Sequence, residues 1–150
     1  MDGYQEWAKE FSLEWLNELL YSIEKNCSEE TCAILLDRCG ACHYQSMEPM
    51  LSGYVGDLDG FIQFMSKEHG QVVTFDQEQN TILVDENKPY CVCPITQSMN
   101  GKKVSPVLCN CSASMTARMI AKVTGKEVKS RVVSSILRGD TSCVYEIKLL

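Results

Sequence analysis

Apolar residues recur every three or four positions from Tyr4 to Ile23, and glutamates occupy positions between them. The apolar stripe consists of Tyr4, Trp7, Phe11, Trp15, Leu19 and Ile23, widened by Leu16 and Leu20, and the polar positions carry Glu6, Glu10, Glu14 and Glu18. This period predicts an amphipathic helix over residues 4–25. Because large aromatic side chains are usually core residues, we expect the stripe to be buried rather than to form a ligand cage.

Two more helices are predicted before Gly70. Ser28, followed by two glutamates, is a helix start signal, and this second helix carries the apolar run 33–36 and ends at Gly40. The third helix begins near Asp57 and ends at Gly70, which acts as its C-terminal cap. The chain up to Gly70 is therefore expected to be helical.

The apolar period then changes to two residues, which is typical of strands. The expected strands are 72–75, 81–84, 90–95, 128–137 and 143–149, with a helix over about 112–125. Pro94 keeps the third strand near a sheet edge, and the last two strands form a hairpin. The element order ααα-βββ-α-ββ predicts an α+β fold in which N-terminal helices pack on an antiparallel sheet.

Length and composition limit the possibilities further. The chain has 150 residues, of which 45% are hydrophobic and 23% charged, so one domain spanning 1–150 is expected. A chain of this length buries enough apolar surface to fold without disulfides. The N-terminus lacks the basic region and apolar stretch of an export signal, and no apolar run is long enough to cross a membrane. We therefore expect a cytoplasmic protein with no membrane partner.

Charge is distributed unevenly along the chain. Residues 1–100 carry five basic and 17 acidic residues, whereas residues 101–138 carry eight basic residues and one acidic residue, Glu127. The basic segment either faces an anionic ligand or pairs with the acidic part of the fold, and the pairing is favoured. Nucleic acid is not an expected partner, because the net charge of −6 and the scattered Lys and Arg do not form a basic surface.

Nine cysteines are the most informative residues, because six of them fall in three close pairs. They lie at positions 27, 32, 39, 42, 91, 93, 109, 111 and 143. Inside a cell such spacing indicates metal or thiol chemistry more often than disulfides. The sequence contains no Ser/His/Asp order, phosphate-binding glycine loop or H-E-x-x-H string, and His69, in the last turn of a helix, is expected to be structural. No catalytic residue can be assigned.

Cys39, Gly40, Cys42 and His43 form a C-x-x-C-H string, which is the spacing of haem c attachment. Haem c is disfavoured, because the string follows a helix and no export signal is present. Two thiolates at this spacing also suit half of a tetrahedral metal site. The alternative, which is equally favoured, is that Cys39 and Cys42 are core cysteines on either side of a helix-capping glycine.

Two C-x-C pairs, Cys91 with Cys93 and Cys109 with Cys111, lie at the edges of expected elements. On a strand, residues i and i+2 point to the same face, so each pair could present two sulfurs together. With Cys143, these residues are the candidate metal ligands, and zinc is favoured over an iron–sulfur cluster. Buried or peroxide-sensitive free thiols are the alternative.

The C-terminal third resembles the end of the 4-vinyl reductase domain. The resemblance rests on Val107-Leu108-Cys109 before a helix, Gly125, the strand 128–137, and the string Gly139-Asp140-Thr141-Ser142-Cys143 before an apolar strand. It covers the segment 107–145 and implies a small α+β ligand-binding module that often dimerises. The family holds zinc through four residues, whose positions fall here on Cys109, Val132, Ser135 and Cys143. Because Val132 cannot bind metal and Ser135 replaces a cysteine, the resemblance implies that Cys111, Cys91 or Cys93 completes the site, or that the metal is lost.

A second resemblance leads to the alternative functions. Arg38-Cys39-Gly40 with Cys42, together with Cys91-x-Cys93-Pro94, is similar to small uncharacterised bacterial proteins related to 2-amino-thiazoline-carboxylate hydrolases. We expect a domain that binds a small apolar or aromatic molecule in a pocket between helices and sheet, with a homodimer as the plausible assembly. One alternative is a hydrolase of a small thio- or amino-substituted acid that uses a cysteine or a metal-bound water. The other is a metal- or redox-responsive interaction protein.

Overall fold

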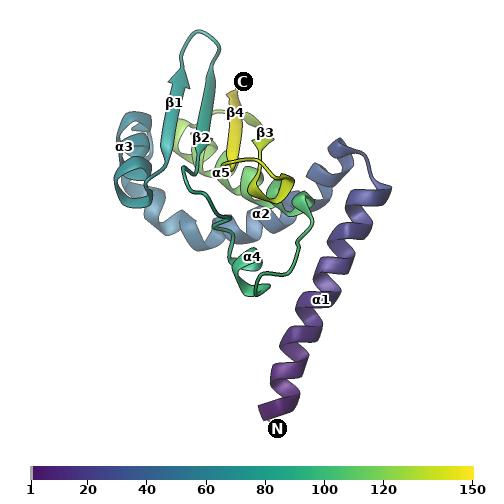
Figure 1. The fold of residues 1–150 in the computed structure, drawn as a ribbon. Coiled ribbons are helices and arrows are strands. Elements are labelled where there is room, and N and C mark those ends of the chain that lie inside the picture. Colours follow the sequence, from purple (N-terminus) through teal and green to yellow (C-terminus); the bar gives the residue numbers. More distant parts are fainter. Residues whose placement is uncertain (1) are drawn as a thin grey trace.

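The computed structural model describes residues 2–150, in which helices precede and flank a four-stranded antiparallel sheet (Figure 1). The helices are α1 (Asp2–Asn26), α2 (Glu29–Leu51), α3 (Leu58–His69), α4 (Pro94–Ser98) and α5 (Cys109–Thr124). The strands are β1 (Val72–Asp76), β2 (Thr81–Asp85), β3 (Val128–Ser134) and β4 (Val144–Leu149). This arrangement confirms the expected α+β class.

The sheet has the order β1-β2-β4-β3, and every neighbouring pair is antiparallel. Ile82 lies opposite Ile147 and Val84 opposite Tyr145, so these apolar pairs share one face of the sheet. All four are buried, because α5 crosses this face and α2 packs against α5 (Figure 1). The alternation predicted for β4 is therefore confirmed, since each inward residue meets a helix.

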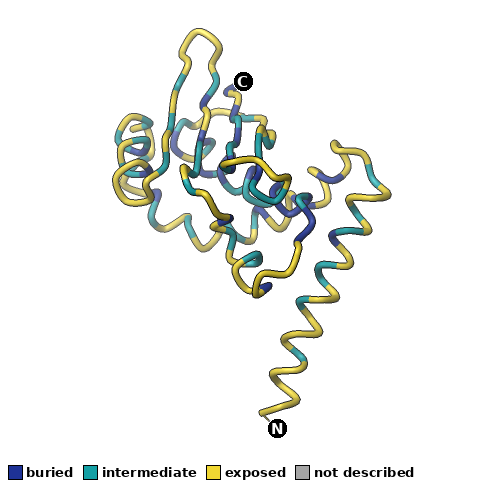
Figure 2. Tube along the Cα trace, viewed as in Figure 1, coloured by how far each residue is buried: buried dark blue, intermediate teal, exposed yellow. Residues whose placement is uncertain are grey.

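Two apolar clusters fill the interior. The main cluster lies between the sheet, α3 and α5 and includes Phe61, Ile120 and Ile147, all of which are fully buried. The second cluster joins the C-terminal half of α1 to α2 and to the segment before α5 through Leu20, Leu36 and Leu108. The α1 helix is thus anchored to the body by its second half, while its first half projects away from it (Figures 1 and 2).

The sequence predicts that the second helix ends at Gly40, and this prediction is wrong. α2 begins at its predicted N-cap, Ser28, whose side chain accepts a hydrogen bond from the Thr31 amide, but it continues to Leu51. Gly40 lies in mid-helix where α2 crosses α5, and a Cβ there would clash with the Ser114 side chain and approach the Cys111 carbonyl oxygen to 2.9 Å. The glycine is needed for this close approach of two helices rather than for a cap.

The expected third strand, 90–95, is also wrong. Residues 91–93 are irregular, and Pro94 begins α4 instead. The Gln97 side chain donates to the Cys91 carbonyl at 2.6 Å and the Gln97 backbone amide donates to the Cys93 carbonyl at 3.0 Å, so these carbonyls are satisfied locally rather than by a strand. Proline at the first helical position favours this outcome because its missing N–H is not required there.

Candidate functional site

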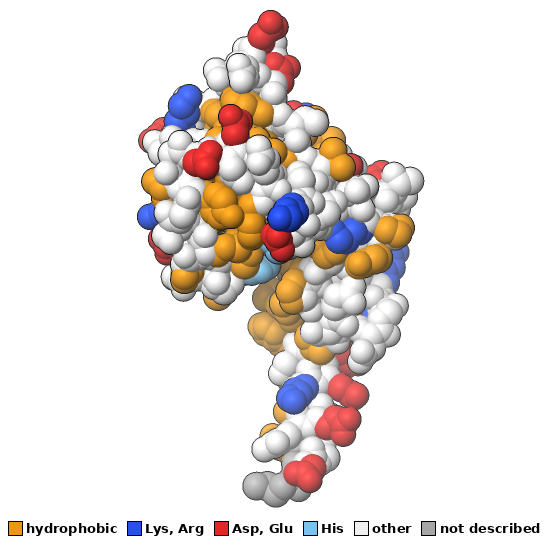
Figure 3. Space-filling model, turned by 90° about the vertical axis from the view of Figure 1, so that its left-hand side faces the viewer, with side chains coloured by type: hydrophobic (Ala, Val, Ile, Leu, Met, Phe, Trp, Pro, Cys, Tyr) orange, Lys and Arg blue, Asp and Glu red, His pale blue; other side chains and the backbone are white. Residues whose placement is uncertain are grey.

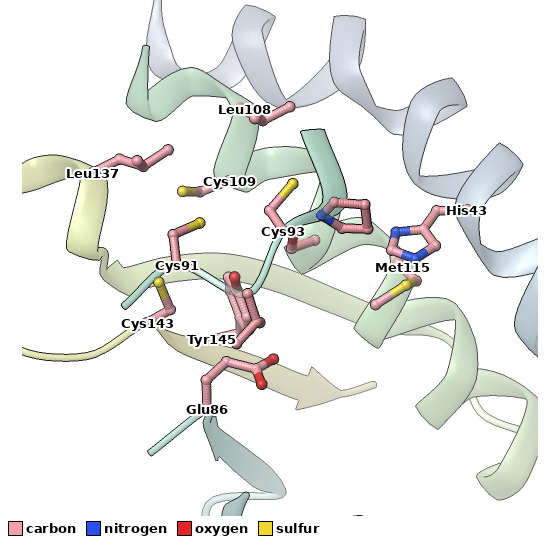
Figure 4. A pocket seen from close by; sticks show the side chains of 13 residues that line it. His43, Glu86, Cys91, Cys93, Leu108, Cys109, Met115, Leu137, Cys143 and Tyr145 are labelled. Carbon is pink, nitrogen blue, oxygen red and sulfur yellow. The ribbon is translucent and has the colours of Figure 1, made fainter. Parts of the chain in front are cut away.

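Four of the cysteines line one small cavity between α5, β4 and the segment before α4 (Figure 4). Cys91 and Cys93 come from that segment, Cys109 from the first turn of α5, and Cys143 from the residue before β4. The cavity has a volume of about 60 Å³ and a mainly apolar lining that includes Leu108 and Tyr145 among others. The structure therefore brings together residues from both C-x-C pairs with Cys143, as their spacing suggested.

Hydrogen bonds fix the thiols of this cavity. Cys109 Sγ lies 3.0 Å from the Ser135 hydroxyl, and the backbone amide of Ile136 donates to Cys143 Sγ at 3.4 Å. The thiol of Cys143 also donates to Cys91, which lowers the pKa of Cys91 from 9.0 to about 6 and raises the pKa of Cys143. This hydrogen bond favours the thiolate at Cys91 and the proton at Cys143.

Burial favours the neutral thiol at Cys109 and Cys111. Burial raises the pKa of Cys109, and the hydrogen bond with Ser135 offsets only part of this effect. Burial together with nearby cysteines, first among them Cys93, raises the pKa of Cys111 to about 11. Desolvation disfavours a thiolate, which is the form that binds metal or attacks an electrophile. The pKa of Cys91 is lowered, in contrast to those of Cys109 and Cys111.

The cysteines are not arranged as a metal centre. Within residues 2–150, no group of three or more His, Cys, Asp or Glu side chains is placed to hold a metal ion. The zinc site expected at Cys91, Cys93, Cys109, Cys111 and Cys143 is therefore not shown by this arrangement. The physical reason is that Cys109 and Cys143 are engaged with Ser135 and the Ile136 amide, while Cys111 lies on the neighbouring face of α5 towards α2.

The C-x-x-C-H string lies on the continuous helix α2. Cys39 and Cys42 are exposed, so they are neither core cysteines nor part of the cavity lining. His43 is half-buried and lines the thiol cavity together with a second, adjacent cavity. Of the three residues, the histidine lines the cavities and the two cysteines do not.

The second cavity is apolar and rich in methionine. It has a volume of about 290 Å³ and shares His43, Glu86, Val92, Pro94 and Met115 with the thiol cavity. Phe61, Phe64 and four further methionines, Met47, Met50, Met65 and Met119, contribute to its lining. Figure 3 shows apolar side chains gathered around a hollow in the body of the molecule. Flexible methionine side chains suit irregular spaces of this kind.

A second unusual feature, which the sequence analysis assigned to the core, is exposed. Tyr4, Trp7, Phe11, Trp15 and Leu19, which we call the aromatic ridge, run along the outer side of α1. Tyr4 is 70% exposed and Trp15 is 58% exposed. The side of α1 that faces the body is formed instead by Leu13, Leu16, Leu20 and Ile23. The helix thus has two apolar stripes, and the leucines rather than the aromatic residues fill the core.

The basic segment does pair with the acidic part of the chain. Lys102 contacts Glu14 at 2.8 Å, Arg118 contacts Asp37 at 2.7 Å, and Lys122 contacts Glu48 at 3.7 Å. Each of these bridges joins residues 101–138 to one of the first two helices. In these three ion pairs, basic residues of the segment 101–138 therefore pair with acidic residues of the same chain.

Comparisons with known proteins give a fold but no family. No family model matches the chain, and no curated protein matches it. Among solved structures, it is similar to a trafficking protein particle complex subunit 3 from Naegleria fowleri covalently bound to palmitic acid. The similarity has a TM-score of 0.54 and 14% sequence identity, and covers 97% of this chain and 96% of that one. At this identity the likeness shows the fold alone.

This likeness corrects the family and function expected from the sequence. The similar structure is a subunit of a trafficking complex, which is a different family from the 4-vinyl reductase domain. The expected small-molecule-binding domain and the alternative hydrolase are therefore wrong, and the metal-responsive alternative has no supporting group of ligands in residues 2–150. The string from Gly139 to Cys143 led to the wrong family because it corresponds to a turn before a strand, which unrelated families share.

Helices long and apolar enough to cross a membrane are absent from residues 2–150.

Proposed function

We propose that this chain is a structural subunit of a larger protein assembly, attached to its partner through α1. The observation that carries the proposal is the aromatic ridge. Proteins rarely expose a contiguous apolar patch of this kind unless it is an interaction site, and aromatic residues are enriched where binding energy is concentrated. Here four aromatic residues and a leucine follow one another along the same side of a helix.

The structural likeness supports the same role. The similar Naegleria protein is itself a subunit of a complex, and the likeness extends over nearly the full length of both chains. We take from it only the role as a subunit; the palmitic acid belongs to that protein. Because one fold can serve several functions, the exposed ridge rather than the fold carries the proposal.

A reducing compartment such as the cytoplasm suits this role. All nine cysteines, each of which lies in the described part of the chain, are free thiols, and two of them are exposed on α2. Exposed thiols such as Cys39 and Cys42 persist unpaired where glutathione and thioredoxin keep them reduced.

The test is the native mass of the chain in its own cells. The chain carries a C-terminal affinity tag, is expressed at its natural level, and is purified under gentle, reducing conditions for light scattering after gel filtration. We expect a mass well above the 16.9 kDa of one chain, with a second protein present at fixed stoichiometry. A chain that is monomeric at its natural concentration contradicts the proposal.

A further inference from the structure

We infer that the aromatic ridge docks an amphipathic helix of a different protein, whose apolar face is bordered by lysine or arginine. This inference rests on the proposed role as a subunit and names the chemistry of the partner. A ridge of side chains three and four residues apart is the geometry with which one helix packs against another. All five residues of the ridge are exposed, and the N-terminal part of α1 is exposed along almost its whole length, so a helix can reach the ridge (Figure 2).

The ridge is already ordered for binding. The ring centroids of Tyr4 and Trp7 lie 5.4 Å apart, and those of Trp7 and Phe11 lie 5.3 Å apart with nearly parallel planes, 18° from one another. Such pairs hold one another in place, which lowers the entropy lost when a partner immobilises them. A larger part of the favourable free energy of contact therefore contributes to the affinity for the partner.

The first half of α1 has little packing within the described chain. From residue 2 to residue 12, every side chain except that of Ala8 is exposed. A helical segment of this length is marginal in water without packing against another surface. Contacts with the body begin at Leu13, so they hold the second half of the helix. A helix laid along the ridge supplies the missing packing.

The available area shows that the partner must touch more than the ridge. An aromatic side chain buries on the order of 200 Å², so the half-exposed ridge offers on the order of 500 Å². A stable interface buries about 800 Å² on each partner. The rest of the contact must come from the residues next to the ridge, and their charge therefore selects the partner.

Those neighbouring residues are acidic. Glu6, Glu10, Glu14 and Glu18 follow one another at four-residue spacing, which places them along one edge of the ridge as an acidic border. Lys102 pairs with Glu14, and the other three carboxylates are exposed. Over its whole length α1 carries six acidic and two basic residues. A helix with lysine or arginine beside its apolar face complements this border, in the way that charges flanking a helix seam select partners.

The same border disfavours two other occupants. Antiparallel pairing of two α1 helices would place the two acidic borders against each other, and two chains that each carry a net charge of −6 repel one another. An amphipathic helix that lies on a membrane usually presents lysine and arginine to anionic lipids, whereas this helix presents glutamate. Among the three, the basic helix of another protein fits the surface best.

The test uses two synthetic helical peptides of about 18 residues, or five turns, with the same leucine face. One peptide has lysine on both borders of that face and the other has glutamate. Binding to the purified full chain is measured by fluorescence anisotropy at low and at physiological salt. The chain variants are Trp7→Ala with Phe11→Ala, which removes the centre of the ridge, and Glu6→Gln with Glu10→Gln and Glu18→Gln, which removes the border. Tyr90→Ala, at an exposed aromatic outside α1, is the matched control.

We expect the lysine peptide to bind at least about tenfold more tightly than the glutamate peptide. The ridge variant should weaken its binding by at least about tenfold, whereas Tyr90→Ala should leave it unchanged. The border variant, which keeps the ridge intact, should weaken binding several-fold and reduce its dependence on salt. Equal binding of the two peptides, or unchanged binding by the ridge variant, overturns the inference.

Two control measurements identify the other occupants. Sedimentation of the chain alone that shows a dimer lost in the ridge variant would mean that a second copy covers the ridge. Binding to vesicles of phosphatidylcholine with phosphatidylserine, lost in the same variant, would mean a membrane. Either result overturns the inference. If the tagged ridge variant still enters the native assembly, the proposed attachment through α1 fails together with this inference. If that variant is excluded from the assembly but the two peptides bind equally, only this inference fails; if no assembly exists, the role as a subunit itself fails.

Discussion

Two helices of this protein, α1 and α5, have apolar stripes at the same spacing and opposite fates. In α5 the stripe includes Ala113, Ala117, Ile120 and Val123, and it is buried between the sheet and α2. In α1 the aromatic stripe is exposed, and a separate line of leucines meets the body. Small residues let α5 approach its neighbours closely within the chain, whereas the large aromatic residues of α1 have no such neighbour. The apolar period predicts a helix but not what covers it.

The largest difference in the free energy of unfolding should appear when one apolar residue of each stripe is replaced by alanine. Ile120→Ala in α5 should lower the free energy of unfolding by about 2–5 kcal/mol, because it opens a cavity at a fully buried position. Trp7→Ala in α1 should change it by no more than about 0.5 kcal/mol, since Trp7 is half exposed. Chemical denaturation of both variants measures the difference. If Trp7→Ala destabilises the chain as strongly as Ile120→Ala does, the ridge serves the chain's own core.

The next prediction compares the substitution of alanine for two helical glycines, which should change the free energy of unfolding in opposite directions. Gly40→Ala should lower the free energy of unfolding by about 1–3 kcal/mol, because the added methyl group forces α2 away from Ser114 on α5. Gly3→Ala, in α1, meets no atom within 4 Å and should be neutral or stabilise the helix by up to about 1 kcal/mol. Denaturation midpoints and far-ultraviolet circular dichroism report both. If Gly40→Ala is neutral, the close approach of α2 and α5 is not required.

A smaller effect is expected where α1 joins the body. The Asn17 side chain donates to the Lys103 carbonyl at 2.8 Å and accepts from the Ser105 amide at 3.4 Å. Asn17→Ala should therefore lower the free energy of unfolding by about 1 kcal/mol. Asn26→Ala is the control, because that amide bonds only to Ser22 within the same helix. Equal effects of the two substitutions would mean that Asn17 does not anchor α1.

Most of the fold follows from local signals, and the errors have physical causes. Ser28, Asp57 and Gly70 cap the helices as predicted, because caps depend on neighbouring residues alone. The wrong end at Gly40 arose because a glycine that caps a helix and one that permits a crossing look the same in sequence. The strand predicted over 90–95 was wrong because the carbonyls of Cys91 and Cys93 accept hydrogen bonds from Gln97. These hydrogen bonds form only when the chain turns into α4 at Pro94, which the alternation of residues did not indicate.

The site was predictable only in part. Cys91, Cys109 and Cys143 line one cavity, whereas Cys111, which was expected beside them, does not, and the spacing of the cysteines did not indicate the chemistry of this cavity. Burial raises the pKa of Cys109 and Cys111, and the hydrogen bond with Cys91 raises the pKa of Cys143, so the reactivity of each thiol depends on its folded surroundings. The exposed ridge was missed because aromatic residues are expected in cores. The existence of a second apolar stripe, formed by the leucines of α1, was the signal that could have indicated it.

The smallest expected effect is a pH dependence that belongs to the body and not to α1. In the folded chain the hydrogen bond from Cys143 lowers the pKa of Cys91 to about 6, whereas the unfolded chain releases this proton near 9.0. Between these values the unfolded state binds more protons, so the free energy of unfolding should rise from pH 6 towards pH 9. The raised pKa of Cys143 has the opposite sign and should lower stability above its ordinary pKa of 9.0.

The measurement is the free energy of unfolding of the unchanged chain and of Cys91→Ser, obtained by denaturation across this pH range. The difference between these two free energies isolates the contribution of the thiol pair. The difference between the two proteins should shrink as the pH falls through about 6 and grow towards the ordinary thiol range. The ridge variant, Trp7→Ala with Phe11→Ala, should keep the same difference, because the ridge is not part of the thiol cavity. A flat difference would mean that Cys91 keeps its proton in the folded state. A difference that changes with the ridge would mean that α1 and the thiol cavity are coupled, and the contrast between a self-contained body and a helix that awaits a partner would no longer hold.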